Sequence, residues 1–287
     1  TPPPPIVPPS VPPPPLSPPP PSSPPAPPGL PPASPCRNLD YTILDFSTAT
    51  VSHSNLGGLG PDFSSPHSLR FDHVGRTPDG ATFDMVVTNT STYSVWNYDR
   101  NTINGGFGQV NVMGLQQDTL SMVSGSNATE FSSVDLRFAF KQRGTDDPYT
   151  LTHSAYLSFL DLDASYDLNN RECVAATSSF APSLSYDTQL SSSVEVHPTH
   201  TFSPPRTLYC ATQTGDAADN PTTPWLLSND QMHRSIMYRL DNQDSIDVSL
   251  YLYCCGTGRN ILFAGFSSVV YGNCGSPPPP PPPPPPS

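Results

Sequence analysis

The prolines of this chain are concentrated in two terminal segments, and this distribution constrains the fold more than any other feature. Of 41 prolines, 21 lie in residues 1–35 and ten form the run 277–286, which leaves ten for residues 36–276. Consecutive prolines fix φ near about −65° and remove the backbone N–H, so they favour extended rods of the polyproline II type. The sequence predicts a rod over 1–35, a disulfide-stabilised folded region over 36–276 and a second rod over 277–287.

Three interpretations of the rods remain open. A semi-rigid spacer or disordered linker is the simplest. A PxxP ligand would dock in an aromatic groove, although no basic residue flanks the prolines to orient it. The third is a glycosylated structural rod, because the SPPPP stretch at 17–21 and the VPPPP block at 11–15 resemble the hydroxyproline-rich glycoproteins of plant and green-algal walls. That resemblance implies O-glycosylation in the N-terminal rod, at Pro3, Pro4, Pro5, Pro13, Pro14, Pro15, Ser17, Pro19, Pro20 and Pro21.

The middle region has the pattern of an all-β protein. Apolar residues alternate with polar ones in residues 82–89, 134–140 and 245–253, as in half-buried strands. Further strands are expected at 41–46, 69–73, 109–113, 155–162, 173–178, 194–197, 207–212, 235–240 and 262–270. Residues 224–233 favour a short helix that begins with a capping box of Ser228 and Gln231. Many short strands separated by turn residues predict a β-sandwich or jelly roll, as one large domain or two abutting ones.

All six cysteines lie in the middle region, and their number suits an oxidising compartment. A bridge between Cys36 and Cys274 would join the two points where the rods leave. Cys254 and Cys255 are adjacent on an expected strand and point to opposite faces. We therefore expect them to pair with Cys173 and Cys210 rather than with each other, the alternative being buried free thiols. The sequons at Asn89 and Asn127 also agree with an extracellular protein that carries covalent glycans.

Acidic residues gather at the end of one expected strand. Alternation places Asp161 and Asp163 on the same face, and two like charges so close destabilise a fold unless a cation neutralises them. Further oxygen ligands are available nearby in the chain and in a second turn-rich stretch: Asp167, Glu172, Asp219 and Asn220. Such a set predicts a structural Ca²⁺ site, since Ca²⁺ takes 6–8 oxygen ligands in flexible geometry. The alternative is that Asp163 and Asp219 only cap turns.

Charge and motifs argue against several classes of function. The net charge of −12 opposes a nucleic-acid partner, and no apolar run reaches the length of a membrane span. Residues 265–269 lack the second glycine of a nucleophile elbow. Asp161 and Asp163 are better placed to share a cation than to flank a glycosidic bond. We therefore expect no enzyme.

Several stretches together carry a family resemblance: residues 55–62 (NLGGLGPD), 83–89 (FDMVVTN), 107–111 (FGQVN), 158–163 (SFLDLD), 219–221 (DNP) and 258–265 (GRNILFAG). They resemble secreted β-sandwich domains of microalgal and other protist surface proteins, over most of residues 40–270. Combined with the rods, the chain is similar in architecture to algal matrix, pherophorin-type and flagellar-hair (mastigoneme) glycoproteins.

The resemblance and the rods point to one leading function and one rival. The leading hypothesis is an extracellular structural protomer that self-associates into a helical filament or matrix. The rival is a calcium-dependent lectin or adhesin, in which Tyr93, Trp96, Tyr98 or Trp225 would stack on a sugar ring.

Overall fold

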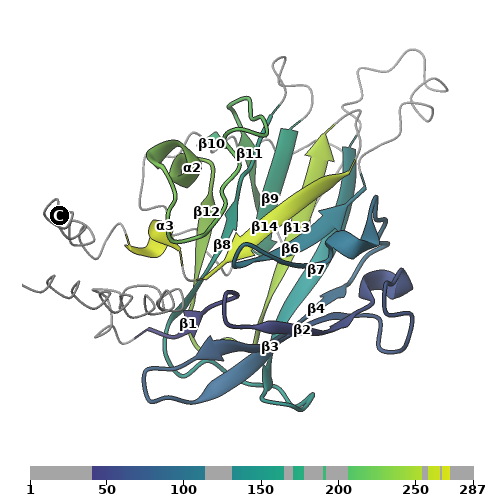
Figure 1. Cartoon of the computed structure of the whole chain (residues 1–287), viewed down its shortest axis with the longest axis vertical. Coiled ribbons are helices and arrows are strands. Elements are labelled where there is room, and N and C mark those ends of the chain that lie inside the picture. The colour runs from purple at the N-terminus through teal and green to yellow at the C-terminus, as the bar shows by residue number, and fades with distance from the viewer. Residues whose placement is uncertain are drawn as a thin grey trace, which may run out of the picture. The chain divides into compact units, whose positions relative to one another are not determined.

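Two antiparallel β-sheets face each other in a sandwich-like arrangement (Figure 1). The computed structural model describes residues 41–113, 131–164, 171–177, 190–191, 206–253, 258–265 and 267–271. The predicted division into rods and folded region stays a prediction, because residues 1–40 and 272–287 lie outside this described part.

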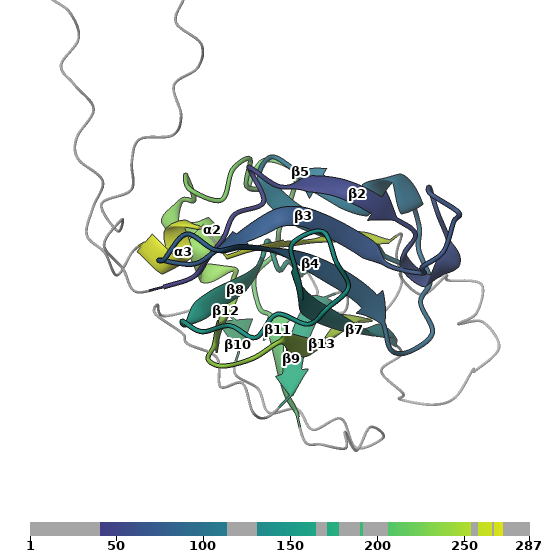
Figure 2. The same ribbon diagram turned by 90° about the horizontal axis from the view of Figure 1, so that it is seen from below.

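The larger sheet has nine strands and curls around the core, as Figure 2 shows from below. Its order is β1 (Ile43–Leu44), β3 (Leu69–Arg76), β4 (Thr82–Asn89), β7 (Phe131–Gln142), β13 (Ser245–Tyr253), β9 (Arg171–Thr177), β11 (Arg206–Ala211) and β10 (Leu190–Ser191), with β2 (Thr50–Ser54) also pairing with β3. The smaller sheet has five strands in the order β12 (Ile236–Leu240), β8 (Ala155–Leu160), β14 (Arg259–Ala264), β6 (Phe107–Val112) and β5 (Thr102–Asn104). The all-β prediction is confirmed, and the finer choice between sandwich and jelly roll is not decided by this topology.

The core lies between the sheets and is built from the alternating apolar residues of the predicted strands. Phe83, Met85 and Val87 of β4 all point inward and are fully buried. At the centre, the ring of Phe263 from the smaller sheet meets Phe71 and Phe138 of the larger sheet, with ring centroids 5.8 and 5.1 Å apart. Because each buried aromatic side chain contributes about 1.5–3 kcal/mol, this contact holds the two sheets together.

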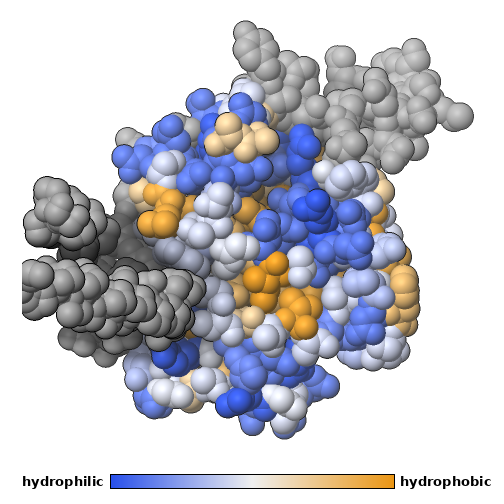
Figure 3. Space-filling model, in the orientation of Figure 1, coloured by the Kyte–Doolittle hydropathy of each residue, from blue (hydrophilic) through white to orange (hydrophobic). Residues whose placement is uncertain are grey.

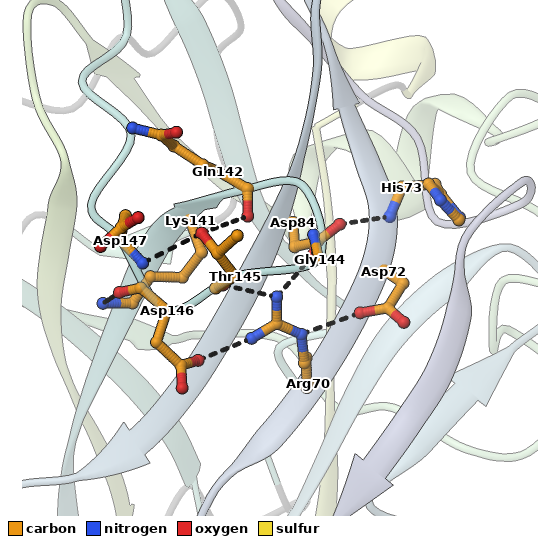
Figure 4. Close-up of polar contacts among 10 residues, drawn as sticks. All are labelled: Arg70, Asp72, His73, Asp84, Lys141, Gln142, Gly144, Thr145, Asp146 and Asp147. Carbon is orange, nitrogen blue, oxygen red and sulfur yellow. Dashed lines mark hydrogen bonds and ion pairs between the residues drawn. The ribbon is translucent and has the colours of Figure 1, made fainter.

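The outer face of β4 is also buried, contrary to the expected half-buried strand. Asp84 on this face is fully buried and receives hydrogen bonds from the amides of His73 and Gly144, both at distances below 3 Å (Figure 4). Arg70 of β3 donates to Asp84, Asp72 and Asp146. Burial opposes ionisation of Asp84, but these hydrogen bonds and the guanidinium outweigh it and lower its pKa. The loop after β7 is thereby fastened over β4.

Several strand boundaries differ from the sequence prediction, most clearly at the last described strand. The strand expected at 262–270 ends at Ala264, and the short helix α3 (Ser268–Tyr271) follows. Gly265 lies between the strand and the helix. A larger residue would not fit there, because its Cβ would lie 2.4 Å from the Cβ of Leu44. Strands β2, β5 and β10 were not expected from the pattern, since they are short or largely polar. The strand predicted at 194–197 lies outside the described residues.

The expected pairing of Cys173 and Cys210 with Cys254 and Cys255 is wrong. Cys173 and Cys210 are bonded to each other, because they are direct partners in the register of β9 and β11. Both are buried in a small apolar cluster with Ala175, apart from the main core. The other four cysteines lie outside the described residues.

The predicted helix forms as α2 (Asn229–His233) with its capping box intact. The Gln231 amide donates to the Ser228 hydroxyl, and the Ser228 amide donates to the Gln231 side chain. The helix is shorter than the predicted 224–233 because the box fixes its start at Ser228. Within the described part of the chain, no helix is long and apolar enough to cross a membrane.

Candidate metal centre

Asp161, Asp163 and Asp219 come together at one end of the smaller sheet. One carboxylate oxygen from each lies within 4.8 Å of the others, and all three side chains are partly buried. This grouping could hold a metal ion, because three carboxylates around one point supply the hard oxygen ligands that Ca²⁺ prefers. The predicted convergence of two acidic stretches is confirmed for these three residues.

The end of β8 sets the positions of the first two carboxylates. Leu162 between them is fully buried in the core, and its amide donates to the carbonyl of Arg234 at 3.0 Å. Asp161 has a left-handed φ of 62°, so the regular strand stops before it. The carbonyl of Asp163 accepts a hydrogen bond from the amide of Glu172 at 3.0 Å. Core packing and two backbone hydrogen bonds thus fix this acidic turn.

The third carboxylate arrives on a separate loop that runs beside the first. Ala164 and Thr214 form a parallel bridge between the two segments. Gly215 is required at the crossing, because a Cβ there would lie 1.9 Å from the carboxyl carbon of Asp163. The backbone carbonyl of Asp219 accepts a hydrogen bond from the Gln231 side chain at 2.7 Å, which ties the loop to α2.

Arg234, which sequence reasoning missed, neutralises part of the cluster. Its Nη1 atom lies 2.7 Å from Asp163 and 2.8 Å from Asp219, and its Nη2 donates to the carbonyl of Thr214. Arg234 follows directly after α2, so the position of the capped helix places this arginine next to the carboxylates. A signal existed in the sequence, since paired carboxylates need a cation and an arginine is a more frequent solution than a metal.

Asp161 is left without such a partner. Among the described residues it makes no hydrogen bond and no ion pair. Burial, together with the charges of Asp163 and Asp219, raises the pKa of Asp161 to about 7. Burial also raises the pKa of Asp163, although Arg234 opposes this. A proton or a bound cation on Asp161 would relieve the same repulsion.

Glu172 is fully buried beside the cluster and pairs with Arg259 at 3.1 Å. Burial and the nearby charge of Asp163 raise the pKa of Glu172 well above its usual range, although Arg259 acts in the opposite direction. Four carboxyl groups (the triad and Glu172) thus lie near only two guanidinium groups (Arg234 and Arg259), so the cluster is acidic.

The other predicted ligands do not join the triad. Glu172 faces Arg259, and Asn220 is exposed in the turn after Asp219. Asp167 lies outside the described residues. The described geometry therefore supports three of the six predicted ligands.

Most of the predicted glycosylation sites lie outside the described residues. These are Asn127 and every proline and serine proposed for O-glycosylation. Asn89 ends β4, is partly buried, and donates a hydrogen bond from its side chain to the carbonyl of Ser91. Its glycosylation stays a prediction.

The four aromatic residues proposed for sugar stacking divide by exposure. Tyr93 is buried in the core, and its hydroxyl lies 2.5 Å from the carbonyl oxygen of Asn111 and 3.1 Å from the side-chain oxygen of Asn101. Trp225 is partly buried and packs over Gly106. Trp96 and Tyr98 are exposed. Only these last two are placed to meet a ligand.

Comparisons with known proteins identify no family for this chain. No family model matches it, and no curated protein matches it. Among solved structures, it is similar to the adhesin domain of PrgB from Enterococcus faecalis, with a TM-score of 0.37 and 10% sequence identity over 69% of this chain. The match spans 63% of that chain, less than two thirds of its length. This distant likeness concerns the β-rich architecture alone.

Proposed function

We propose that this protein is a structural protomer of an extracellular filament or matrix, with a β-sandwich bead between two polyproline rods. The observation that carries the proposal is the position of the first and last described elements. Leu44 of β1 packs against Gly265, three residues before α3. The first described strand and the residue that follows the last described strand therefore lie side by side.

The Cys173–Cys210 disulfide supports the extracellular setting, because such bonds persist in oxidising compartments. Within the proposal, the rods carry O-linked glycans at the N-terminal prolines, and a Cys36–Cys274 bridge joins the two exits. A rod attached at one side of a bead can contact the next bead in a head-to-tail manner. Such heterologous contacts grow into an open helix when the rotation between copies does not close.

The acidic triad fits a structural Ca²⁺ ion within this function. Asp161 lacks a hydrogen-bond or ion-pair partner in the described structure, and a divalent cation would relieve its repulsion from Asp163 and Asp219. Asp161, Asp163 and Asp219 would hold the ion. Bound Ca²⁺ would stabilise the folded bead by mass action, by about 2.7 kcal/mol when its concentration is 100 times its dissociation constant.

Electron microscopy of the purified full chain, combined with mass spectrometry of its tails, tests the proposal. We expect elongated assemblies with a regular repeat, and hydroxylated, glycosylated prolines in residues 1–35. Monomeric particles with unmodified prolines, at concentrations where secreted matrix proteins assemble, would contradict a structural protomer.

One observation favours a carbohydrate-binding module as the second candidate. The exposed Trp96 and Tyr98 present aromatic faces of the kind that stack on sugar rings. A glycan array with the full chain, in the presence of Ca²⁺ and of a chelator, separates the candidates. Selective binding that requires Ca²⁺ would favour the lectin, whereas no binding beyond background would leave the structural role as the better account.

A further inference from the structure

Three exposed aromatic residues, Phe63, Trp96 and Tyr98, form what we call the aromatic surface. Phe63 is 71% exposed, Trp96 49% and Tyr98 41%. The rings of Phe63 and Tyr98 meet edge to face with centroids 6.1 Å apart. On the face drawn in Figure 3, hydrophobic residues form small patches among hydrophilic ones. Large aromatic side chains that stay exposed next to one another are typical of a binding surface.

The loop that carries Phe63 is fixed by polar contacts with two side chains, those of Asn55 and His53. The buried Asn55 donates to the carbonyl of Ser64 at 2.5 Å and accepts from the amide of Gly60 at 3.0 Å. His53 of β2 lies 2.5 Å from the carboxylate of Asp62 and 2.6 Å from the carbonyl of Pro66. The exposed ring therefore sits on a fixed loop.

The segment that carries Trp96 and Tyr98 is fixed in the same way. The side chain of the buried Asn111 accepts hydrogen bonds from the amides of Trp96 and Asn97, both at 2.9 Å. Asn97 is extended, with φ −146° and ψ 105°, so the residues on either side of it project to the same side of the segment. Such fixed positions lower the entropy cost of binding a rigid ligand.

The chemistry of the aromatic surface matches a polyproline II chain. Such a chain is apolar and uncharged, and its carbonyl groups need external hydrogen-bond donors because proline has no N–H. Aromatic rings provide the apolar contact, as in the modules that recognise proline-rich segments. The indole N–H of Trp96 and the hydroxyl of Tyr98 are on exposed side chains and form no hydrogen bond among the described residues, so they are free to donate.

Two proline-rich segments exist in this chain, and the length of their uninterrupted proline runs distinguishes them. The runs in residues 1–35 are at most four prolines long and are separated by other residues. Residues 277–286 are ten consecutive prolines, and a polyproline II helix of this length is about 30 Å long. The C-terminal segment is therefore the better ligand.

The position of α3 indicates that the ligand comes from another copy. Figures 1 and 2 both show α3 at one side of the folded region, and the coil of η1 (Leu56–Gly58), close in sequence to Phe63, at the opposite side. The fifteen residues from 272 to 286 reach roughly 50 Å when extended. The path around a domain of this size is about 70 Å. The segment is too short to reach the aromatic surface of its own bead.

Resting on the proposed filament, we propose that the aromatic surface docks residues 277–286 of a second copy of this chain. Each bead then receives the C-terminal rod of one neighbour and donates its own to the next, which is the head-to-tail contact that an open filament requires.

The test uses the full chain and a synthetic peptide of ten prolines as the probe. We expect the peptide to bind the full chain, to shorten its assemblies by competition, and to bind at least tenfold more weakly to Phe63→Ser and Tyr98→Ser. Leu226→Ser is the matched control, because Leu226 is a 76% exposed apolar side chain that is not one of the three residues of the aromatic surface. A ten-residue Gly-Ser peptide controls for the probe. Unchanged thermal unfolding of the two serine variants shows that they remain folded.

Each result separates this inference from the proposed function. Assemblies that form normally in Phe63→Ser and Tyr98→Ser would overturn the docking inference and leave the structural role intact. Aromatic-dependent peptide binding without any filament would support docking and contradict the filament. The inference is also overturned if the ten-proline peptide does not bind, or if only glycans, or only a peptide of residues 1–21, bind to the aromatic surface.

Discussion

Individual residues in this protein show how buried charge is balanced in two different ways. Asp84 is fully buried but has two amide donors and Arg70, which together lower its pKa. Asp161 is partly buried among other carboxylates, without a donor, and its pKa rises to about 7. Burial acts in the same direction on both groups, so the difference lies in the partners that surround each carboxylate.

The first prediction concerns Asp161→Asn. The folded-state pKa of Asp161 is above its unfolded value of about 3.9, so the folded protein holds this proton more tightly. Without metal, the stability of the wild-type protein should fall as pH rises from about 4 through 7. Asp161→Asn should weaken this dependence and add about 1 kcal/mol or more to the free energy of unfolding at pH 8. Thermal unfolding in a chelator between pH 5 and 8 measures both effects.

The exposed Asp216→Asn is the control, and it should leave the pH dependence unchanged. Added Ca²⁺ should raise the unfolding temperature of the wild-type protein more than that of Asp161→Asn. Equal Ca²⁺ effects on the two proteins would contradict a role for Asp161 as a ligand.

The second prediction concerns Asp84→Asn. This change removes the buried charge that faces the partly buried Arg70, so the free energy of unfolding should decrease by about 2–4 kcal/mol. Because the pKa of Asp84 is lowered, its contribution is present above the unfolded value and is lost as pH falls through the folded value. Asp146→Asn removes a partner of the same Arg70, but its side chain is 88% exposed, so less than about 1 kcal/mol should be lost. Similar losses in the two variants, measured by urea denaturation, would show that burial does not decide the value of this ion pair.

At the scale of elements, β9 contributes side chains to a different apolar cluster on each face of the large sheet. Val174 and Ala176 pack in the main core, while Cys173 and Ala175, which alternate with them, belong to a separate apolar cluster on the other face. Alternation along a strand explains both memberships. The disulfide therefore holds the β9–β11 pair from the outer face, where the main core cannot.

The third prediction follows from that position. Replacing both partners, Cys173→Ser with Cys210→Ser, should lower the free energy of unfolding by about 3–4 kcal/mol, the loop-entropy estimate for a separation of 37 residues. Hydrogen exchange should become faster in the amides of β9 and β11, while those of β3 and β4 keep their relative protection. Uniformly faster exchange across both sheets would mean that the disulfide supports the whole fold.

At the scale of the whole molecule, the bead and the rods have separate roles. The core between the two sheets accounts for folding, whereas a polyproline helix has no internal hydrogen bonds and adds no apolar core. In the proposed filament, assembly depends on the rods and on the surface proposed to receive them.

The fourth prediction separates these roles. A chain in which residues 277–286 are replaced by a Gly-Ser sequence of equal length should unfold at the same temperature, within about 0.5 kcal/mol of the original stability. Its assemblies, measured by sedimentation and electron microscopy, should be lost. A large drop in unfolding temperature would show that the C-terminal segment is part of the folded core.

The sequence by itself determined the class of fold, because strand formation follows a local pattern. The alternation in β4 and β13 predicted both strands with their correct ends, and the Ser228 capping box predicted the start of α2. The convergence of Asp161, Asp163 and Asp219 was also predicted, from two acidic stretches that could supply oxygen ligands to one cation.

Only the tertiary structure decided which groups meet across the chain. The Cys173–Cys210 pairing depends on the register of β9 and β11, which no local pattern fixes. Arg234 reaches Asp163 from 71 residues away, and Gly215 makes room for that carboxylate. The aromatic surface likewise joins two loops whose residues, Phe63 and Tyr98, meet only after folding. Alternation assigns a side chain to a face, but packing between distant segments selects its neighbours.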